Sequence, residues 1–282
     1  MANAFARDLE LMFENVVEGY DAACVLSRAA ETSFPDPQAM QRAGDTFYKK
    51  QNYHAATVSG LDVSGSTRVD VIDRFVPTVF NSPQNVIYEL DAKELRDAQT
   101  MVKMGQAAAQ SLAAEVETNL YAKCAAQASI FVKKVGAIAW DDGATAEALM
   151  ISRGIKSADR KLFLNPFDYS VIAKDLGNKA YMGDRSKDAY ERSMVPDIAT
   201  FSTFRTDQIA NVTTNGTVTG TTVNANTSHT VTAMTGDLPT DNRYGALVVA
   251  GANIANTVAG AAFTIAGVNA VHMIGKGDTG QP

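Results

Sequence analysis

The sequence has 282 residues, of which 46% are apolar and 20% charged, a globular composition with room for one large domain or two ordinary ones. Its net charge of −6 argues against a nucleic-acid-binding protein, which needs a basic face for phosphate groups. Acidic residues between Asp8 and Glu14 interrupt the apolar start of the chain, which argues against a secretory signal peptide. Two cysteines, Cys24 and Cys124, are too few for a disulfide framework, so both are expected to be buried free thiols.

The first helix is predicted within residues 1–33. Apolar residues recur there at steps of three and four, which is typical of a helix with one apolar face. Pro35 and Pro37 then break the pattern, so the segment is expected to be an arm hinged on the body. An ordinary first helix packed on its own core is the alternative. The recurring apolar residues are Phe5, Leu9, Met12, Phe13, Val16, Val17 and Tyr20.

Residues 46–90 are predicted to form a long hairpin. Two stretches rich in β-branched and aromatic residues flank a loop that contains Gly60 and Gly65. Charged side chains are too frequent for a buried sheet, so a solvent-facing hairpin is expected. A two-stranded edge folded back on the body is the alternative. The charged residues of this segment include Lys49, Lys50, Arg68, Asp70, Asp73 and Arg74.

A long helix is predicted over residues 92–134, a stretch without proline. Asp91 is the expected N-cap, and Glu94 is its expected partner in a capping box. Such a helix would be roughly 60 Å long, longer than one compact domain needs. Gly105 is expected to bend it, and several alanines allow other elements to approach closely. The expected inner stripe is Leu95, Ala98, Val102, Gly105, Ala109, Leu112, Val116, Leu120, Cys124, Ala128 and Phe131.

A helix, a strand and a second helix are expected after the long helix. Asp142 is placed to cap the first of them, and "KLFL" at residues 161–164 is a short apolar strand. Asn165 followed by Pro166 is a favourable start for the second helix.

The composition changes at Asn211, where threonine, asparagine, valine and glycine become frequent, which predicts strands and turns. Residues 244–275 contain no charged side chain. Asparagines and glycines interrupt this run, so it is expected to be a buried β-rich segment rather than a membrane-spanning helix.

No residue pattern indicates catalysis or metal binding. His54, His229 and His272 are far apart and have no accompanying acid or thiol pattern, so surface or core positions are expected for them. Asp141 and Asp142 are a candidate carboxylate pair for acid–base chemistry, but helix capping explains them more simply. We therefore expect no enzyme activity, no cofactor and no metal ion.

Four blocks of the sequence carry a resemblance to a known family. They are "AMQRAGDTFYKKQ" at residues 39–51, "ELDAKELRDAQ" at 89–99, "FLNPFDY" at 163–169 and "DAYERSMVPDIATF" at 188–201. The sequence resembles the major capsid protein of tailed double-stranded-DNA bacteriophages, which has the Hong Kong 97-like fold. It is most similar to the coat proteins of short-tailed Salmonella phages, which carry an inserted β-domain. The similarity spans most of residues 1–210, and beyond them rests mainly on composition and on "FTIAGV".

The resemblance implies an α+β fold with named parts. Residues 1–40 would be the N-arm, 41–91 the extended loop that reaches a neighbouring subunit, and 92–210 a peripheral domain with its spine helix and the start of an axial domain. Residues 211–282 would begin the inserted domain, which is expected to be incomplete because the return to the axial domain is absent.

The expected function is self-assembly into the hexamers and pentamers of an icosahedral virion shell, put together in the host bacterial cytoplasm. The shell would enclose double-stranded DNA without reading its sequence, with a portal at one vertex and no contact with a membrane. A scaffolding protein is the expected assembly partner. The alternative is a β-rich phage tail or adhesin component, suggested by the threonine- and asparagine-rich end.

Two sets of site residues follow from this interpretation. Subunit contacts are expected at the hairpin charges Lys49, Lys50, Arg68, Asp70, Asp73 and Arg74. Docking of an amphipathic partner is expected on the N-arm stripe Phe5, Leu9, Phe13 and Val17.

Overall fold

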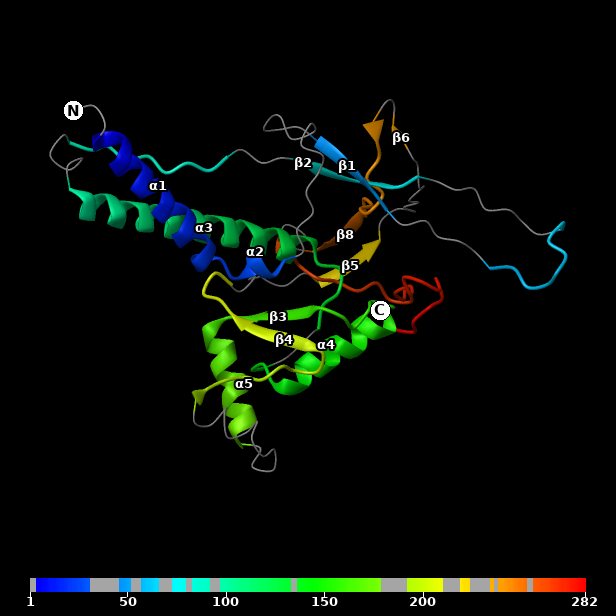
Figure 1. Ribbon diagram of the computed structural model, residues 1–282. Helices are drawn as coiled ribbons and strands as arrows, with labels where there is room; N and C mark the ends of the chain where they lie inside the picture. Colours follow the sequence, from blue (N-terminus) through cyan, green and yellow to red (C-terminus); the bar gives the residue numbers. More distant parts are fainter. Residues whose placement is uncertain are drawn as a thin grey trace. The chain divides into compact units, whose positions relative to one another are not determined.

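The protein combines helices and strands in two compact units (Figure 1). The first unit contains Met1–Glu31, Asn85–Thr213 and Val258–Pro282, and the second contains Thr32–Gln84 and Thr214–Thr257. The structure, a computed structural model, describes residues 4–30, 46–51, 57–65, 73–79, 83–91, 97–132, 136–178, 192–209, 219–223, 234–235, 238–252 and 256–282.

The long helix of the first unit is α3 (Ala98–Gln127), which is shorter than predicted. Its N-cap is Asp97, because the backbone there is extended and the carboxylate accepts hydrogen bonds from Gln99 N–H at 3.1 Å and the Thr100 hydroxyl at 2.8 Å. The prediction of Asp91 as the cap is therefore wrong, and Glu94 lies outside the described residues. With 30 residues, α3 is about 45 Å long.

The buried face of α3 also differs from the predicted stripe. Among the described residues, only Gly105 and Ala109 belong to both sets, because the face that meets the N-terminal helix is rotated from the most apolar face. Leu95 lies outside the described residues. Cys124 is exposed, so the prediction of two buried thiols holds for Cys24 alone. The buried residues of α3 are Met101, Gly105, Ala108, Ala109, Ala113 and Glu117.

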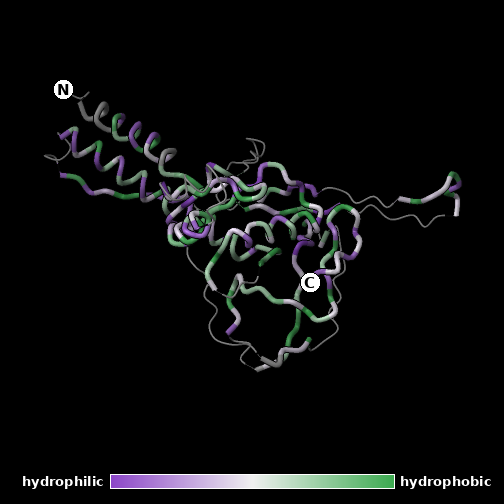
Figure 2. The backbone as a smooth tube through the Cα atoms, turned by 90° about the horizontal axis from the view of Figure 1, so that it is seen from below, coloured by the Kyte–Doolittle hydropathy of each residue, from purple (hydrophilic) through white to green (hydrophobic). Residues whose placement is uncertain are grey.

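Helix α1 (Ala4–Ala23) and the short helix α2 (Leu26–Ala29) lie along α3 and run in the same direction (Figure 1). Of the two interpretations of the N-terminus, the structure therefore has the packed helix. Figure 2 shows hydrophilic and hydrophobic segments alternating along both long helices. Each helix thus has one face for its neighbour and another for solvent.

A mixed core lies in the same unit, around the strands β3 (Arg160–Leu164) and β4 (Phe201–Arg205) and the helix α5 (Pro166–Asn178). The two strands are parallel, so the chain must cross over between them, and α5 lies on that connection. The core residues are Leu164, Ile172, Ala173, Leu176, Val195 and Ile198, with Ile138, Trp140, Leu162 and Tyr169 packed against them.

The predicted capping residues near this core are confirmed. Asn165 Oδ1 accepts the N–H of Phe167 at 3.0 Å, and Pro166 is the first residue of α5. The other helix, α4 (Trp140–Ser152), carries Asp142 in its first turn, where the carboxylate accepts the N–H of Ala139 at 2.7 Å. Helix capping thus accounts for this aspartate.

The uncharged run of residues 244–275 is not buried, contrary to prediction. Its described part contains only one strand, β8 (Val249–Ala252), followed by turns, and it leaves many large apolar side chains exposed. A two-stranded pair leaves both of its faces open, so such a strand has nothing to be buried against. Beyond β8, the chain returns to the first unit, where Met273 N–H donates to the carbonyl of Arg153 at 2.9 Å.

The described residues of the second unit form three antiparallel strand pairs. The predicted hairpin is confirmed as the pairing of β1 (Thr46–Lys50) with β2 (Phe75–Val79), in which Lys50 lies opposite Phe75. An isolated bridge joins Phe75 to Asp241, so the hairpin and the β-rich segment belong to one unit. The other pairs are β5 (Thr219–Val223) with β8, and β6 (Met234–Thr235) with β7 (Leu238–Pro239).

Candidate functional site

The most unusual side chain of the first unit is Glu117, a carboxylate buried on α3 with only 2% of its surface exposed. Its Oε2 accepts the N–H of Leu26 at 2.6 Å. Its Oε1 accepts the N–H and the hydroxyl of Ser27 at 2.8 and 2.7 Å. A hydrogen bond to a charged group contributes about 1.5–3 kcal/mol, so these three offset the cost of burying the charge.

Both ends of α2 are held by other elements of the same unit. Its own N-cap residue, Val25, makes no side-chain cap, and Glu117 supplies that cap from α3 instead. At the other end, the ammonium group of Lys161 on β3 donates to the carbonyl of Ala29. A negative charge at the N-terminus of a helix and a positive charge at its C-terminus both stabilise the helix, because they interact favourably with its dipole. A four-residue helix is too short to persist alone, so these contacts define it.

Small residues let α1 approach α3 closely. A Cβ atom at Gly105 would lie 2.8 Å from the carbonyl oxygen of Met12, and one at Gly19 would lie 3.0 Å from the Cβ of Ala109. Both distances are shorter than ordinary van der Waals contact, so a larger residue at either position would force the two helices to shift. We name the segment from α1 to α2 the arm, and its contact with α3 the arm–spine junction.

Two further titratable side chains lie near Glu117. Burial raises the pKa of the Tyr20 hydroxyl, with smaller contributions from the Cys24 thiol and then the Glu117 carboxylate. Cys24 itself is buried. The end of the arm thus brings the partly buried Tyr20 hydroxyl close to the buried Cys24 and Glu117 side chains.

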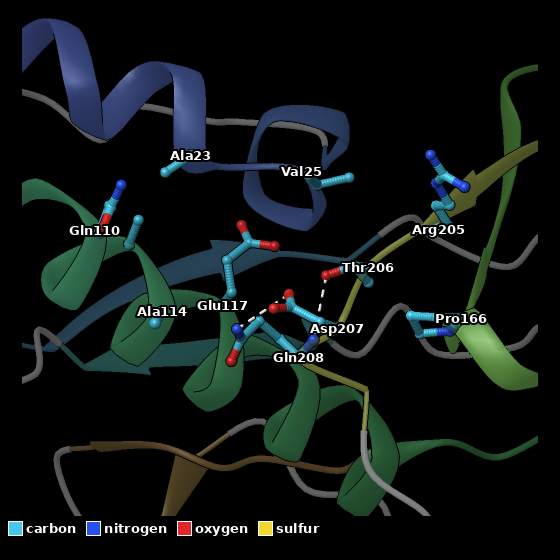
Figure 3. Close-up of a pocket in the computed structure, with 11 residues that line it drawn as sticks. Ala23, Val25, Gln110, Ala114, Glu117, Pro166, Arg205, Thr206, Asp207 and Gln208 are labelled. Carbon is cyan, nitrogen blue, oxygen red and sulfur yellow. Dashed lines mark hydrogen bonds between the residues drawn. The ribbon is translucent and has the colours of Figure 1, made fainter.

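A cavity of about 610 Å³ opens beside the junction (Figure 3). In Figure 3, Glu117 points from α3 toward the turn between α1 and α2, and the loop after β4 forms the facing wall. In that loop Gln208 donates to Asp207 Oδ1 at 3.1 Å and accepts from the Thr118 hydroxyl at 3.0 Å. The cavity is lined by Ala23, Val25, Gln110, Ala113, Ala114, Glu117, Pro166, Arg205, Thr206, Asp207 and Gln208. These side chains offer apolar contacts and hydrogen bonds.

Four of the six predicted contact residues of the hairpin fall on described positions. Lys49, Lys50 and Arg74 are exposed, and Asp73 is half-buried. Lys50 and Asp73 form an ion pair at 3.2 Å, and the Lys50 ammonium lies 5.8 Å from the centre of the Phe75 ring. The charges of Lys50 and Asp73 are therefore already paired with each other within the subunit. The other two residues, Arg68 and Asp70, lie outside the described residues.

The predicted N-arm stripe is only partly described. Phe13 and Val17 are 68% and 56% exposed on α1, on a face that does not meet α3. Phe5 and Leu9 belong to the same helix, but their side chains lie outside the described residues. The single apolar face that the sequence predicts is therefore divided, because Met12 packs on α3 while Phe13 faces solvent.

Sequence reasoning missed Glu117 and Lys161. Glu117 follows Ala113 by four positions, so it lies on the buried face of α3, whose other members are uncharged. This position is the feature of the sequence that could have revealed it. A charged residue at such a position indicates a buried polar partner from another element. Nothing in the sequence around Lys161 indicates the carbonyl that it contacts.

Comparison with known protein families identifies the family of this chain. The family described as "P22 coat protein - gene protein 5" matches residues 1–282. The chain belongs to that family. The P22 coat protein family provides the major capsid protein that forms the phage shell, which confirms the resemblance found in the sequence. Nothing favours the alternative of a tail or adhesin component.

As a member of the P22 coat protein family, the protein self-assembles into a shell and is located in the virion capsid. The contacts described above are therefore those of a capsid subunit. Within the described ranges, no helix combines the length and the hydrophobicity needed to span a membrane. The same part of the chain contains no group of three or more histidine, cysteine, aspartate or glutamate side chains arranged to hold a metal ion.

Proposed function

We propose that this coat protein builds an icosahedral shell of hexamers and pentamers with the Hong Kong 97-like fold. The match of the whole chain to the coat protein family carries this proposal. In it, residues 1–40 act as the N-arm, 41–91 as the extended loop, 92–210 as the peripheral domain with the start of the axial domain, and 211–282 as the inserted domain, whose last residues, Val258–Pro282, belong to the first compact unit. The long helix α3 would stiffen each shell tile.

The hairpin makes contacts between subunits in this proposal. Exposed Lys49 and Arg74 support the idea, together with the charges at Arg68 and Asp70 and the paired Lys50 and Asp73. Exposed ion pairs contribute only about 0–1 kcal/mol each, so they select the register of neighbours more than they bind them.

Charge reversal tests the role of the hairpin. Arg68→Glu and Arg74→Glu should reduce shell yield and leave the circular dichroism of the subunit unchanged. If both variants assemble at the yield of the unmodified protein, the hairpin does not form the contact.

The N-arm docks a scaffolding protein during assembly in this proposal. Phe13 and Val17 offer an exposed apolar strip, and Phe5 and Leu9 extend the same four-residue spacing. Exposed acidic side chains flank the strip on α1, namely Glu10, Glu14 and Glu18. An amphipathic helix would bury its apolar face on such a strip. Phe13→Asp should then reduce scaffold-dependent assembly without lowering the melting temperature of the subunit.

The shell encloses double-stranded DNA without reading its sequence, and a portal occupies one vertex. A net charge of −6 supports weak contact with DNA, because a wall rich in lysine and arginine would hold phosphates against movement. A subunit contact of micromolar strength, about −8 kcal/mol, becomes effectively permanent when many such contacts must break together. Single weak contacts also let misplaced subunits leave while the shell grows.

The protein acts without catalysis, cofactor or metal, and it assembles in the host bacterial cytoplasm. The discriminating experiment is to express it with the neighbouring scaffold gene, image the lysate and analyse washed particles for zinc. Uniform closed shells are the expected result. Soluble monomers with tight, salt-sensitive DNA binding would refute the shell proposal, and stoichiometric zinc would refute the absence of a metal.

A further inference from the structure

We infer that Glu117 is a positioning residue for assembly: its carboxylate holds the arm on α3 and so fixes the direction in which the exposed face of α1 points. This inference rests on the proposed function only for the use of that face. The attachment itself follows from the contacts of the first unit.

The three hydrogen bonds of Glu117 all come from the start of α2. Leu26 and Ser27 precede Glu117 in the sequence by 91 and 90 positions. These bonds therefore join two distant parts of the chain rather than neighbouring turns of one helix. Elsewhere, the described buried residues of α3 are Met101, Gly105 and alanines, which offer α1 apolar surface. Shape sets how closely the helices approach, but smooth small side chains resist sliding weakly. Glu117 supplies the directional contact at the end of that face.

The second tie on α2 fixes the same end of the arm to another element. Lys161 on β3 holds the carbonyl of Ala29, while Glu117 holds the amides of Leu26 and Ser27. Helix α2 is thereby fixed between α3 and the strand pair. Since α1 leads into α2 after only two residues, its rotation about its own axis is constrained. Phe13 and Val17 then face solvent instead of turning toward α3.

Hydrogen exchange of the purified, unassembled subunit tests the attachment. In Glu117→Ala the amides of α1 should exchange at least about tenfold faster, the effect of losing one charge-assisted hydrogen bond. Amides of α5 should keep their rates, because α5 has its own core. Glu117→Gln should have a smaller effect, since its carbonyl can still accept from Ser27 while its amide group faces the N–H of Leu26. The Gln variant carries the comparison if the Ala variant does not fold.

A matched control is available on the same helix. Glu115 is exposed and accepts from the side-chain amide of Asn119 on the same helix, at 2.9 Å, so Glu115→Gln should leave exchange of α1 unchanged. A double-mutant cycle of Glu117→Ala with Ser27→Ala separates positioning from general packing, because alanine removes the oxygen that accepts the Ser27 hydroxyl. The two changes should be non-additive in the exchange of α1 if the carboxylate acts through the Ser27 hydroxyl.

Unchanged exchange of α1 in both Glu117 variants, an equal rise in α5, or an additive cycle would each overturn the positioning role. If α1 is released and shells still form at normal yield, Glu117 positions the arm, but the arm is not the docking surface of the proposed function. If Phe13→Asp stops assembly while the Glu117 variants keep α1 protected, the proposed function stands and the positioning role fails.

Discussion

Gly105→Ala is the sharpest test of how closely α1 and α3 pack. The added Cβ would lie 2.8 Å from the carbonyl oxygen of Met12, and ordinary contact begins at 3.4 Å, so the backbone of α1 must move by about 0.6 Å. Overpacking of this kind costs about 1–3 kcal/mol. Alanine gains about 1 kcal/mol over glycine inside a helix. The net effect should be a loss of about 0–2 kcal/mol, carried by the arm.

The control for this variant is Ala107→Gly, an exposed position on the same helix where only helix propensity changes. It should lower stability by about 1 kcal/mol. Hydrogen exchange of α1 is the suitable assay, because the single tryptophan, Trp140, packs on the core around β3 and does not report on the arm. A Gly105→Ala variant that gains what Ala107→Gly loses would show that the two helices do not touch at this glycine.

Three further predictions concern single side chains. Hydrogen bonds from a threonine hydroxyl and then from a backbone N–H lower the pKa of Asp97. The stabilising effect of this carboxylate on the start of α3 is therefore complete above the ordinary aspartate pKa and is lost as the pH falls through the lowered value. Asp97→Ala should remove this pH dependence of the hydrogen exchange of α3. Hydrogen bonds from the Arg243 side chain lower the pKa of Asp241, and Arg243→Ala should raise it toward the ordinary value in an NMR titration. Maleimide should label Cys124 in the native subunit and Cys24 only after unfolding; native labelling of both would contradict the burial of Cys24.

Local features of the fold could be predicted from the sequence. The caps at Asn165 and Asp142 were found because a cap depends on residues within three positions of the helix start. The hairpin strands were found because β-branched residues bracket a glycine-containing loop. The start of α3 was misplaced because Asp91 and Asp97 are equally good caps by type, and only the backbone conformation distinguishes them.

The candidate site could not be predicted, because it depends on which elements meet. The role of Glu117 needs α2 to lie over the end of α3, and no pattern within either helix encodes that contact. The exposure of Cys124 has the same origin, since the covering segment ends at Glu117, about two turns earlier. Phe13 likewise has helical spacing typical of a core residue and yet faces solvent, because α3 covers the other side of α1.

The attachment of the arm to α3 also has a consequence for biosynthesis. The arm leaves the ribosome first, but Glu117 follows Ser27 by 90 positions. Because the ribosome adds about 5–20 residues per second, roughly 5–20 s pass between the synthesis of α1 and the synthesis of the α3 surface on which it packs. Contacts between such distant segments also slow folding, because a long loop must close before they form. The nascent coat subunit therefore exposes apolar surface until α3 has been synthesised, and chaperones that cover this surface would raise the yield of assembly-competent protein.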